Sequence, residues 1–259
     1  MTLRTATFDD SGVSETIGYI LVFAIVLTGI AGIVLFGVTM LNDAKDRNNF
    51  QNIEQGLNVV QSDMKRVALE KAPLKTTRMH VEGGTLATNI TRATVQVEFD
   101  GHTYSNTTGD ITYYSNTGLK KLSIENGGLW KTYGGQLDDL VISQPRVYSS
   151  PENYEVVVNV VRINGTPSSF GGAGTVNLAM RYGGTAVYTY DAAAPSDVKL
   201  TINTAYPNAW GRFMQDTIDG FAVTSTDVTN SSIKLTISGV SRLVVSEHTI
   251  EIAPFVLTS

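Results

Sequence analysis

Few residues of this chain have the types and spacings that catalysis or metal binding requires. The three histidines, His80, His102 and His248, lie far apart in the sequence and have no ligand-type neighbours. The chain has no cysteine, which excludes a thiolate nucleophile, a thiolate zinc site, a disulfide and a lipid-modified cysteine anchor. From these residues we expect no enzymatic activity, no metal site and no cofactor.

Serine and aspartate give no stronger signal for chemistry. The two Gly-Val-Ser stretches, at residues 12–14 and 239–241, lack the final glycine of the nucleophile elbow of serine hydrolases. Asp138 and Asp139 do not have the spacing of a calcium-binding loop, so we expect them to be solvated carboxylates. A membrane-tethered hydrolase is therefore the least favoured class, because the sequence offers no nucleophile and base.

Asparagine is the residue type whose spacing indicates a modification. Asn-x-Ser/Thr, the acceptor pattern for N-linked glycans, occurs at Asn89, Asn106, Asn164 and Asn230. A chain rich in Asn, Ser and Thr also produces such triplets by chance, and Pro167 follows the third one directly. On a secreted chain each of the four is a candidate glycan site in a surface loop.

The charge of the chain argues against a nucleic-acid partner. Its 259 residues carry a formal net charge of −5, and no run of basic residues is present. Binding to a phosphate backbone needs clustered Lys and Arg side chains, and the chain lacks such a cluster. The length is enough for one sizeable domain and an accessory element.

A long apolar segment lies near the N-terminus. The 27 residues at 16–42 contain no charged side chain, and a helix of roughly 20 apolar residues spans a bilayer core. The apolar part of a cleavable secretory signal is shorter, roughly 7–15 residues, so we expect this segment to be a retained membrane helix. Lys and Arg are too evenly divided between its two flanks to indicate an orientation.

The helix is expected to continue beyond the membrane segment. From Phe50 to Val67 apolar residues recur at spacings of three and four, which is typical of a narrow stripe on one helix face. Pro73 disfavours helical geometry at Ala72. We therefore predict a helix over 13–72, with a membrane or filament-core part at 16–42 and an amphipathic extension at 43–72. The stripe can pack on the chain's own globular domain, on a neighbouring subunit, or on both.

Small residues line one face of the apolar segment. Ala24, Thr28 and Gly32 are four residues apart, so they lie on the same side of a helix. In an apolar environment small side chains allow two helix backbones to approach closely. Such residues are also common in membrane helices generally, so the face is a weak signal by itself.

The remainder of the chain, 73–259, has the pattern of a β-rich domain. Short runs rich in Val, Ile, Thr and Tyr alternate with Gly, Asn, Asp and Ser, which indicates about eight or nine strands. Three of these runs lie at residues 175–182, 186–190 and 198–202. The spacing favours an antiparallel sandwich or barrel-like domain, and with the leading helix the fold class is α+β.

One insertion in the β-rich region has a helical pattern. It spans residues 207–218, and Asn208 is a suitable N-cap. A helix here would place its apolar side chains on one face, toward the sheet. The residues expected on that face are Trp210, Phe213, Met214 and Ile218.

The N-terminal region resembles archaeal type IV pilins. A short charged leader ends in a small residue and is followed by Val13-Ser14-Glu15-Thr16-Ile17-Gly18 and the long apolar segment. This arrangement is similar to the class III signal peptide of archaeal pilins and pilin-like proteins, above all the haloarchaeal ones. The resemblance is detailed over residues 9–72 and extends to the β-rich remainder only in general character.

The resemblance implies that the leader is removed and the helix retained. In that family a membrane aspartyl prepilin peptidase cuts before the apolar segment, so residues 1–12 would be the leader and Gly12–Val13 the cleaved bond. The bond between Ser11 and Gly12 is the second candidate. The chain departs from its relatives in three ways: Glu15 would be the third mature residue where bacterial pilins have glutamate at the fifth, Ser-Glu replaces the common Ser-Pro, and no basic residue adjoins the cut.

The resemblance also implies a function and partners. The protein would be a structural subunit of a pilus-like filament, held in the membrane before assembly and then exposed at the cell surface for adhesion or surface contact. Its partners would be copies of itself or other pilins, the prepilin peptidase and the membrane assembly machinery. The residues expected to serve assembly are Glu15, Ala24, Thr28 and Gly32, with Glu15 pairing with the Val13 amine of a neighbour or lying at the membrane interface. The alternative is a membrane-anchored surface protein that binds a partner as a monomer.

Overall fold

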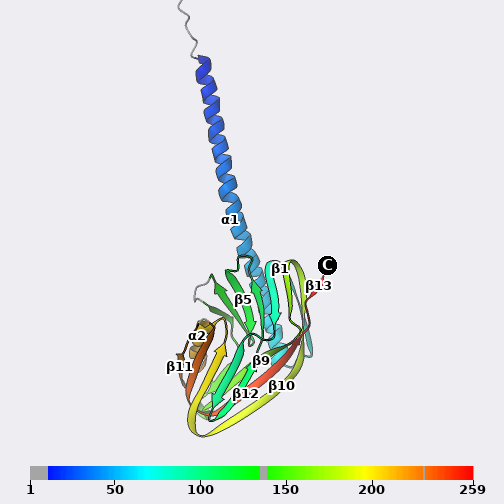
Figure 1. The fold of residues 1–259 in the computed structure, drawn as a ribbon, viewed down its shortest axis with the longest axis vertical. Coiled ribbons are helices and arrows are strands. Elements are labelled where there is room, and N and C mark those ends of the chain that lie inside the picture. Colours follow the sequence, from blue (N-terminus) through cyan, green and yellow to red (C-terminus); the bar gives the residue numbers. More distant parts are fainter. Residues whose placement is uncertain (1–10, 135–138, 230, 259) are drawn as a thin grey trace, which may run out of the picture. The chain divides into compact units, whose positions relative to one another are not determined.

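The computed structural model describes residues 11–134, 139–229 and 231–258 (Figure 1). The chain divides into two compact units, one ending at Asn48 and one formed by Asn49–Ser259. Helix α1 (Ser11–Leu69) is followed by a mostly antiparallel β-sheet domain that also contains a short 3₁₀ helix, η1 (Pro151–Asn153), and a second α-helix, α2 (Pro207–Thr217). The α+β class expected from the sequence is confirmed.

Helix α1 ends three residues before the position expected from Pro73. Lys71 adopts a left-handed conformation, with φ of 57°, and the Ala72 N–H donates to the Arg66 carbonyl oxygen over 3.1 Å. This reversal ends the helix at Leu69 before the proline can influence it. The predicted boundary at 72 was wrong because the left-handed turn is formed by a lysine, whereas glycine is the usual residue there.

Within the described part of the chain, thirteen strands form one continuous sheet. The strands are β1 (Leu74–Asn89), β2 (Thr94–Phe99), β3 (His102–Thr107), β4 (Asp110–Tyr114), β5 (Lys120–Glu125), β6 (Gly128–Tyr133), β7 (Leu140–Ser143), β8 (Val147–Ser150), β9 (Glu155–Gly165), β10 (Ser168–Asn203), β11 (Ala222–Thr226), β12 (Ser232–Ile252) and β13 (Val256–Thr258). Their order is β7-β6-β5-β4-β1-β10-β12-β9-β8, with β2, β11 and β13 attached to β10 or β12 and β3 attached to β2. Among the described pairings only β9 with β12 is parallel.

The two longest strands, β10 and β12, organise the sheet (Figure 1). The three runs predicted as separate strands, 175–182, 186–190 and 198–202, are parts of β10. Between them Gly184, Asp191 and Ser196 still pair with β12, whereas the alanines at 192–194 do not, and the register shifts at Tyr182/Gly184 and again between Asp191 and Val198. Such irregularities bend a strand while keeping it in the sheet, so one long strand replaces the three expected short ones.

The β domain encloses two hydrophobic cores. The first, the helix core, packs α1 against strands β1, β4, β5, β6, β9, β10 and β12; its residues include Phe50, Ile53, Leu57, Val60, Met64, Val67, Met79, Val81, Leu86, Leu122, Leu178 and Ile250. The second, the α2 core, packs α2 against β2, β9, β10 and β12; its residues include Val95, Val97, Val156, Leu200, Ile202, Trp210, Phe213, Met214, Ile218, Leu235 and Ile237. Strands β9, β10 and β12 contribute to both cores, which makes the two cores parts of one folded unit.

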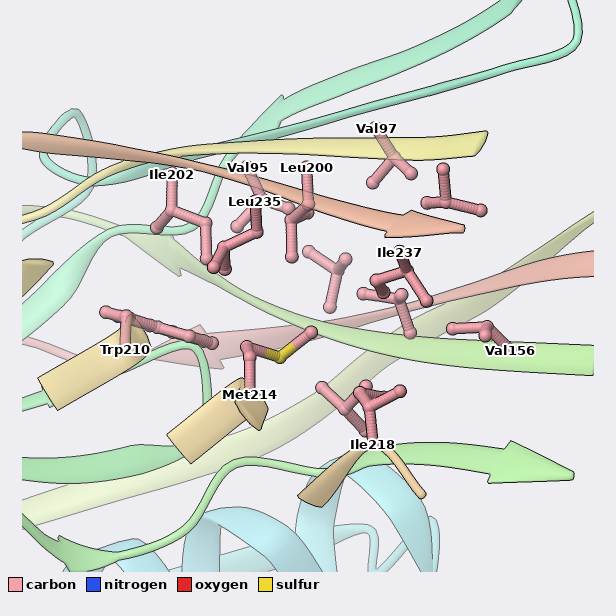
Figure 2. Close-up of a cluster of buried hydrophobic side chains, with 14 of the residues drawn as sticks. Val95, Val97, Val156, Leu200, Ile202, Trp210, Met214, Ile218, Leu235 and Ile237 are labelled. Atoms are coloured by element: carbon pink, nitrogen blue, oxygen red, sulfur yellow. The ribbon is translucent and has the colours of Figure 1, made fainter. Parts of the chain in front are cut away.

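Helix α2 buries the face that the sequence predicted, but it begins one residue before the predicted N-cap. Figure 2 shows Trp210 and Met214 directed toward strand residues such as Leu235. The helix begins at Pro207, so Asn208 lies inside the helix and is not the N-cap. A carboxylate oxygen of Asp139 accepts the Ala209 N–H over 3.0 Å and so satisfies one of the free donors of the first turn.

This contact also corrects the expectation for Asp139. The residue is only 3% exposed, so it is not a solvated carboxylate. Its backbone carbonyl oxygen accepts a hydrogen bond from the Arg212 guanidinium. Asp139 therefore contacts α2 at two positions, Ala209 in the first turn and Arg212 in the second, while Asp138 lies outside the described residues.

Candidate functional site

The N-terminal part of α1 carries an apolar surface that the chain itself does not cover. Every large apolar side chain from Ile17 to Leu41 is exposed, from 49% at Leu27 to 73% at Ile33 and Phe36. The exposed side chains lie all around the helix, and the segment is long and apolar enough to cross a membrane. Because exposed apolar surface of this extent is unfavourable in water, the segment requires lipid or other helices around it.

No other described part of the chain covers the small-residue face of Ala24, Thr28 and Gly32, and the hydroxyl group on this face is hydrogen-bonded within the helix. The Thr28 hydroxyl donates to the Ala24 carbonyl oxygen over 2.8 Å, and Thr39 makes the same kind of bond to Leu35 over 3.0 Å. These bonds remove the cost of placing a hydroxyl in an apolar environment. A Cβ added at Gly32 would meet no atom within 4 Å, so the chain leaves room at this face for a neighbour.

The predicted processing and assembly residues at the start of α1 are only partly described. The helix begins at Ser11, so Gly12, Val13 and Glu15 lie in its first turns. Their side chains are outside the described part of the structure. The pairing expected for Glu15 therefore stays a prediction, whereas Ala24, Thr28 and Gly32 lie together along one helix face as expected.

The amphipathic part of α1 packs on the β domain. Phe50, Leu57 and Met64 are at most 3% exposed and belong to the helix core. On its flank, the Lys131 ammonium contacts the Glu54 carboxylate at 2.5 Å. Of the two partners that the sequence allowed for this stripe, the chain's own domain is the one present in the structure.

A buried pair of carboxyl groups lies where the β4–β5 hairpin meets α2, and sequence patterns did not indicate it. Asp110 and Glu125 are directly opposite each other in the two strands, and they are 5% and 3% exposed. Burial raises the pKa of Glu125 to about 7 and also raises the pKa of Asp110. Because two like charges on opposite positions repel, a proton on one of them stabilises the arrangement.

The surroundings of this carboxyl pair connect it to α2. The Trp210 indole N–H donates to the Glu125 carboxyl group over 3.2 Å, and the Trp130 indole N–H donates to the Glu125 backbone oxygen over 3.0 Å. The two indole rings stack with centroids 4.6 Å apart. The protonation of Glu125 is therefore linked to the packing of α2.

Cationic and phenolic groups complete the cluster. Burial lowers the pKa of the Lys121 ammonium, which lies 5.0 Å from the centre of the Tyr206 ring. Burial also raises the pKa of the Tyr206 phenol. The Arg92 guanidinium donates to the Tyr114 hydroxyl. Among the described residues neither Asp110 nor Glu125 has a cationic group within 4 Å, so the two carboxyl groups are not neutralised by ion pairs.

The histidines do not converge on a site. His80 is exposed, and His102 stacks on Tyr190 at 4.8 Å between ring centres. His248 is buried and contacts Thr185 at 3.1 Å and Asn159 at 3.2 Å, and burial lowers its pKa. No group of three or more His, Cys, Asp or Glu side chains within the described ranges is placed to hold a metal ion.

The candidate glycan sites differ in their surroundings. Asn164 is exposed at the end of β9. Asn89 is half-buried, and its side-chain oxygen accepts the Thr91 N–H over 2.8 Å, as in an Asx turn. The Asn106 amide nitrogen, the atom to which a glycan is attached, donates to the Glu247 carboxylate over 3.0 Å. Asn230 lies outside the described residues.

Together these observations define a class of protein: one N-terminal helix that is able to cross a membrane, followed by a mostly antiparallel β-sheet domain. Residues 12–253 match the family of unknown function DUF7289, and the chain belongs to this family. A relative from Archaeoglobus fulgidus, described as an uncharacterized protein, is 23% identical over an alignment that covers 85% of this chain and 88% of the relative. No solved structure matches the chain.

Proposed function

We propose that the protein is a structural subunit of a type IV pilus-like surface filament that assembles through the N-terminal part of α1. The observation that carries the proposal is the apolar surface from Ile17 to Leu41, which is exposed on all sides of the helix. Lipid tails satisfy such a surface in the membrane, and neighbouring helices of the same kind satisfy it in a filament core. One segment thus serves both as an anchor and as an assembly element.

Processing precedes assembly in this proposal. A prepilin peptidase removes residues 1–12, and the helix then begins at Val13. A carboxylate in an apolar filament core requires a partner, and the new amino group of Val13 in an adjacent subunit supplies one for Glu15. The archaeal source of the relative agrees with the archaeal pilins that the N-terminal sequence resembles.

The β domain acts in this proposal as the outward part of the subunit and has a binding or structural task, not a catalytic one. Two cores joined by β9, β10 and β12 make the domain stable without disulfides. A stable domain on the outside of a filament serves adhesion or surface contact. The machinery that assembles the filament lies in the membrane.

The decisive experiment compares Gly32→Leu with Ile33→Leu in cells that produce the protein. Gly32 belongs to the open small-residue face, whereas Ile33 is 73% exposed on the adjacent side and the change there keeps the volume nearly constant. A leucine at position 32 separates neighbouring backbones and removes close contacts that an apolar environment does not replace. We expect filaments with Ile33→Leu, no filaments with Gly32→Leu, and equal amounts of both proteins in the membrane.

The measurements are negative-stain microscopy of surface material and immunoblots of membrane fractions. Equal filament formation by the two variants contradicts assembly through the small-residue face. Absence of filaments from the unaltered protein as well contradicts the proposal as a whole, and a monomeric membrane-anchored surface protein then becomes the better description.

A further inference from the structure

A hollow of about 550 Å³ opens at the surface of the β domain. Its walls come from the C-terminal part of α1, the loop between β7 and β8, strand β8, and the end of α2 with the residues after it. All of these belong to the unit formed by Asn49–Ser259. Pockets of roughly 300–1,000 Å³ are the size that small-molecule ligands occupy.

Two cationic side chains line this hollow. Lys65 of α1 donates to the Gln144 carbonyl oxygen over 2.7 Å, and the Arg146 guanidinium donates to the Tyr148 hydroxyl over 2.9 Å. Among the described residues neither cation has a carboxylate within 4 Å. The fold therefore holds two positive charges at one hollow without a paired anion.

This arrangement is electrostatically unfavourable for the charged form of Lys65. Burial, followed by the positive charge of Arg146, lowers the pKa of the Lys65 ammonium to about 8. An anion placed between the two cations would raise the pKa of Lys65 again, because opposite charge and hydrogen-bond acceptors favour the ammonium form. The hollow is thus prepared for negative charge.

The other lining groups indicate what kind of anion fits. The Ser149 hydroxyl oxygen accepts the Asp219 N–H over 2.9 Å, so its own hydrogen can be donated to a ligand. Thr217 adds a hydroxyl group, and the Tyr148 side chain is partly exposed. These donors suit a ligand that carries several hydroxyl groups as well as a charge.

Asp219 limits the charge of the ligand. It is the carboxylate among the described lining residues, and it is exposed. With Lys65 and Arg146 it leaves a net charge of about +1, which suits one carboxylate group better than a doubly charged phosphate.

We propose that this hollow binds a hydroxylated carboxylate of monosaccharide size, such as a hexuronate, with its carboxylate between Lys65 and Arg146. The proposal is independent of filament assembly, because one copy of the chain supplies all of the described lining residues. It gives the β domain a specific surface for contact with acidic saccharides.

The test is calorimetric titration of the full-length protein in non-ionic detergent with galacturonate. We expect saturable binding of galacturonate and none of the neutral sugar galactose. Lys65→Gln and Arg146→Gln should each weaken binding at least tenfold. Arg66→Gln is the matched control, because Arg66 adjoins Lys65 on α1, is 53% exposed at its side chain and does not line the hollow. That variant removes the same charge and should bind normally.

The pH dependence and two further probes complete the test. Binding by the unaltered protein should weaken as pH rises through about 8, since Lys65 then loses its proton, and Lys65→Gln should not show this dependence. Equal binding of galactose, or equal losses in Arg66→Gln and Lys65→Gln, overturns the proposal. Inorganic sulfate and phosphate binding as tightly as galacturonate overturns the saccharide assignment. Absence of saturable galacturonate binding at millimolar concentration overturns the site itself.

Discussion

The two parts of helix α1 use the same kinds of side chain in opposite ways. Between Ile17 and Leu41 apolar residues occupy all sides of the helix and remain exposed. Between Phe50 and Val67 all of the large apolar residues except the exposed Val59 lie in one stripe, and that stripe is at most 3% exposed. The difference lies in the angular distribution of the apolar residues, because Leu, Ile, Val and Phe dominate both parts.

This comparison shows how one helix can belong to two environments. A one-sided stripe can be covered completely by a single partner, and here the β domain covers it. Apolar residues on all sides cannot be covered by one neighbour, so they require lipid or several helices. The amphipathic part of α1 is therefore a component of the domain core, whereas the first part is not covered by any other described part of the chain.

The largest expected effect comes from comparing two matched leucine substitutions, one in each part of α1. Leu57→Ala opens a cavity in the helix core and should lower the free energy of unfolding of the β domain by about 2–5 kcal/mol. Leu27→Ala removes the same atoms from the exposed part and should leave the free energy of unfolding of the β domain unchanged. The measurement is denaturant unfolding of the full-length protein in non-ionic detergent.

Tryptophan fluorescence is a suitable signal for this measurement. The chain has two tryptophans, and Trp130 and Trp210 are both buried in the β domain, at 0% and 1% exposure. The fluorescence therefore reports on the domain and not on the apolar part of α1. Equal destabilisation by Leu27→Ala and Leu57→Ala would contradict the division of the helix into two roles.

The second prediction concerns the stability of the β domain, which should depend on pH through a buried group that the apolar part of α1 does not share. The pKa of Glu125 is raised by burial from its ordinary value of 4.5 to about 7. The folded state therefore binds the proton more tightly than the unfolded state. The stability from this group is fully present below about pH 4.5 and is lost as pH rises through about 7.

The expected loss is at most about 3 kcal/mol across this range. Glu125→Gln stays neutral and should reduce the decline of the free energy of unfolding between pH 4.5 and pH 8. Leu27→Ala should retain the full decline, since it lies in the other part of the molecule. An unchanged slope in Glu125→Gln would mean that Asp110 or another group carries the proton.

The smallest expected effect concerns charged residues on the two parts of α1. Glu54 contacts Lys131 at 2.5 Å, and the two side chains are 23% and 11% exposed. Glu54→Gln should lower the free energy of unfolding by about 1 kcal/mol, with a smaller loss at high salt. Asp43→Asn, at an exposed position of the first part, should change it by less than about 0.5 kcal/mol. The same fluorescence measurement, at low and high salt, compares the two.

Local patterns in the sequence were enough to predict several features of this protein. Absence of charge over residues 16–42 predicted a helix that is able to cross a membrane, and the 3–4 spacing from Phe50 predicted its buried stripe. The buried face of α2 was also confirmed. Each of these depends on neighbours within one element, and the periodicity of a helix or strand is visible in the sequence itself.

Only the tertiary structure decided which distant residues meet. Asp110 and Glu125 become cross-strand neighbours through the β4–β5 pairing. Lys65 and Arg146 reach one hollow from a helix and a loop. Asp139 supports α2 from far along the chain. Strand pairing and packing depend on the register of elements that are separate in sequence, so the burial, the shifted pKa values and the hollow follow from the fold and from no local pattern.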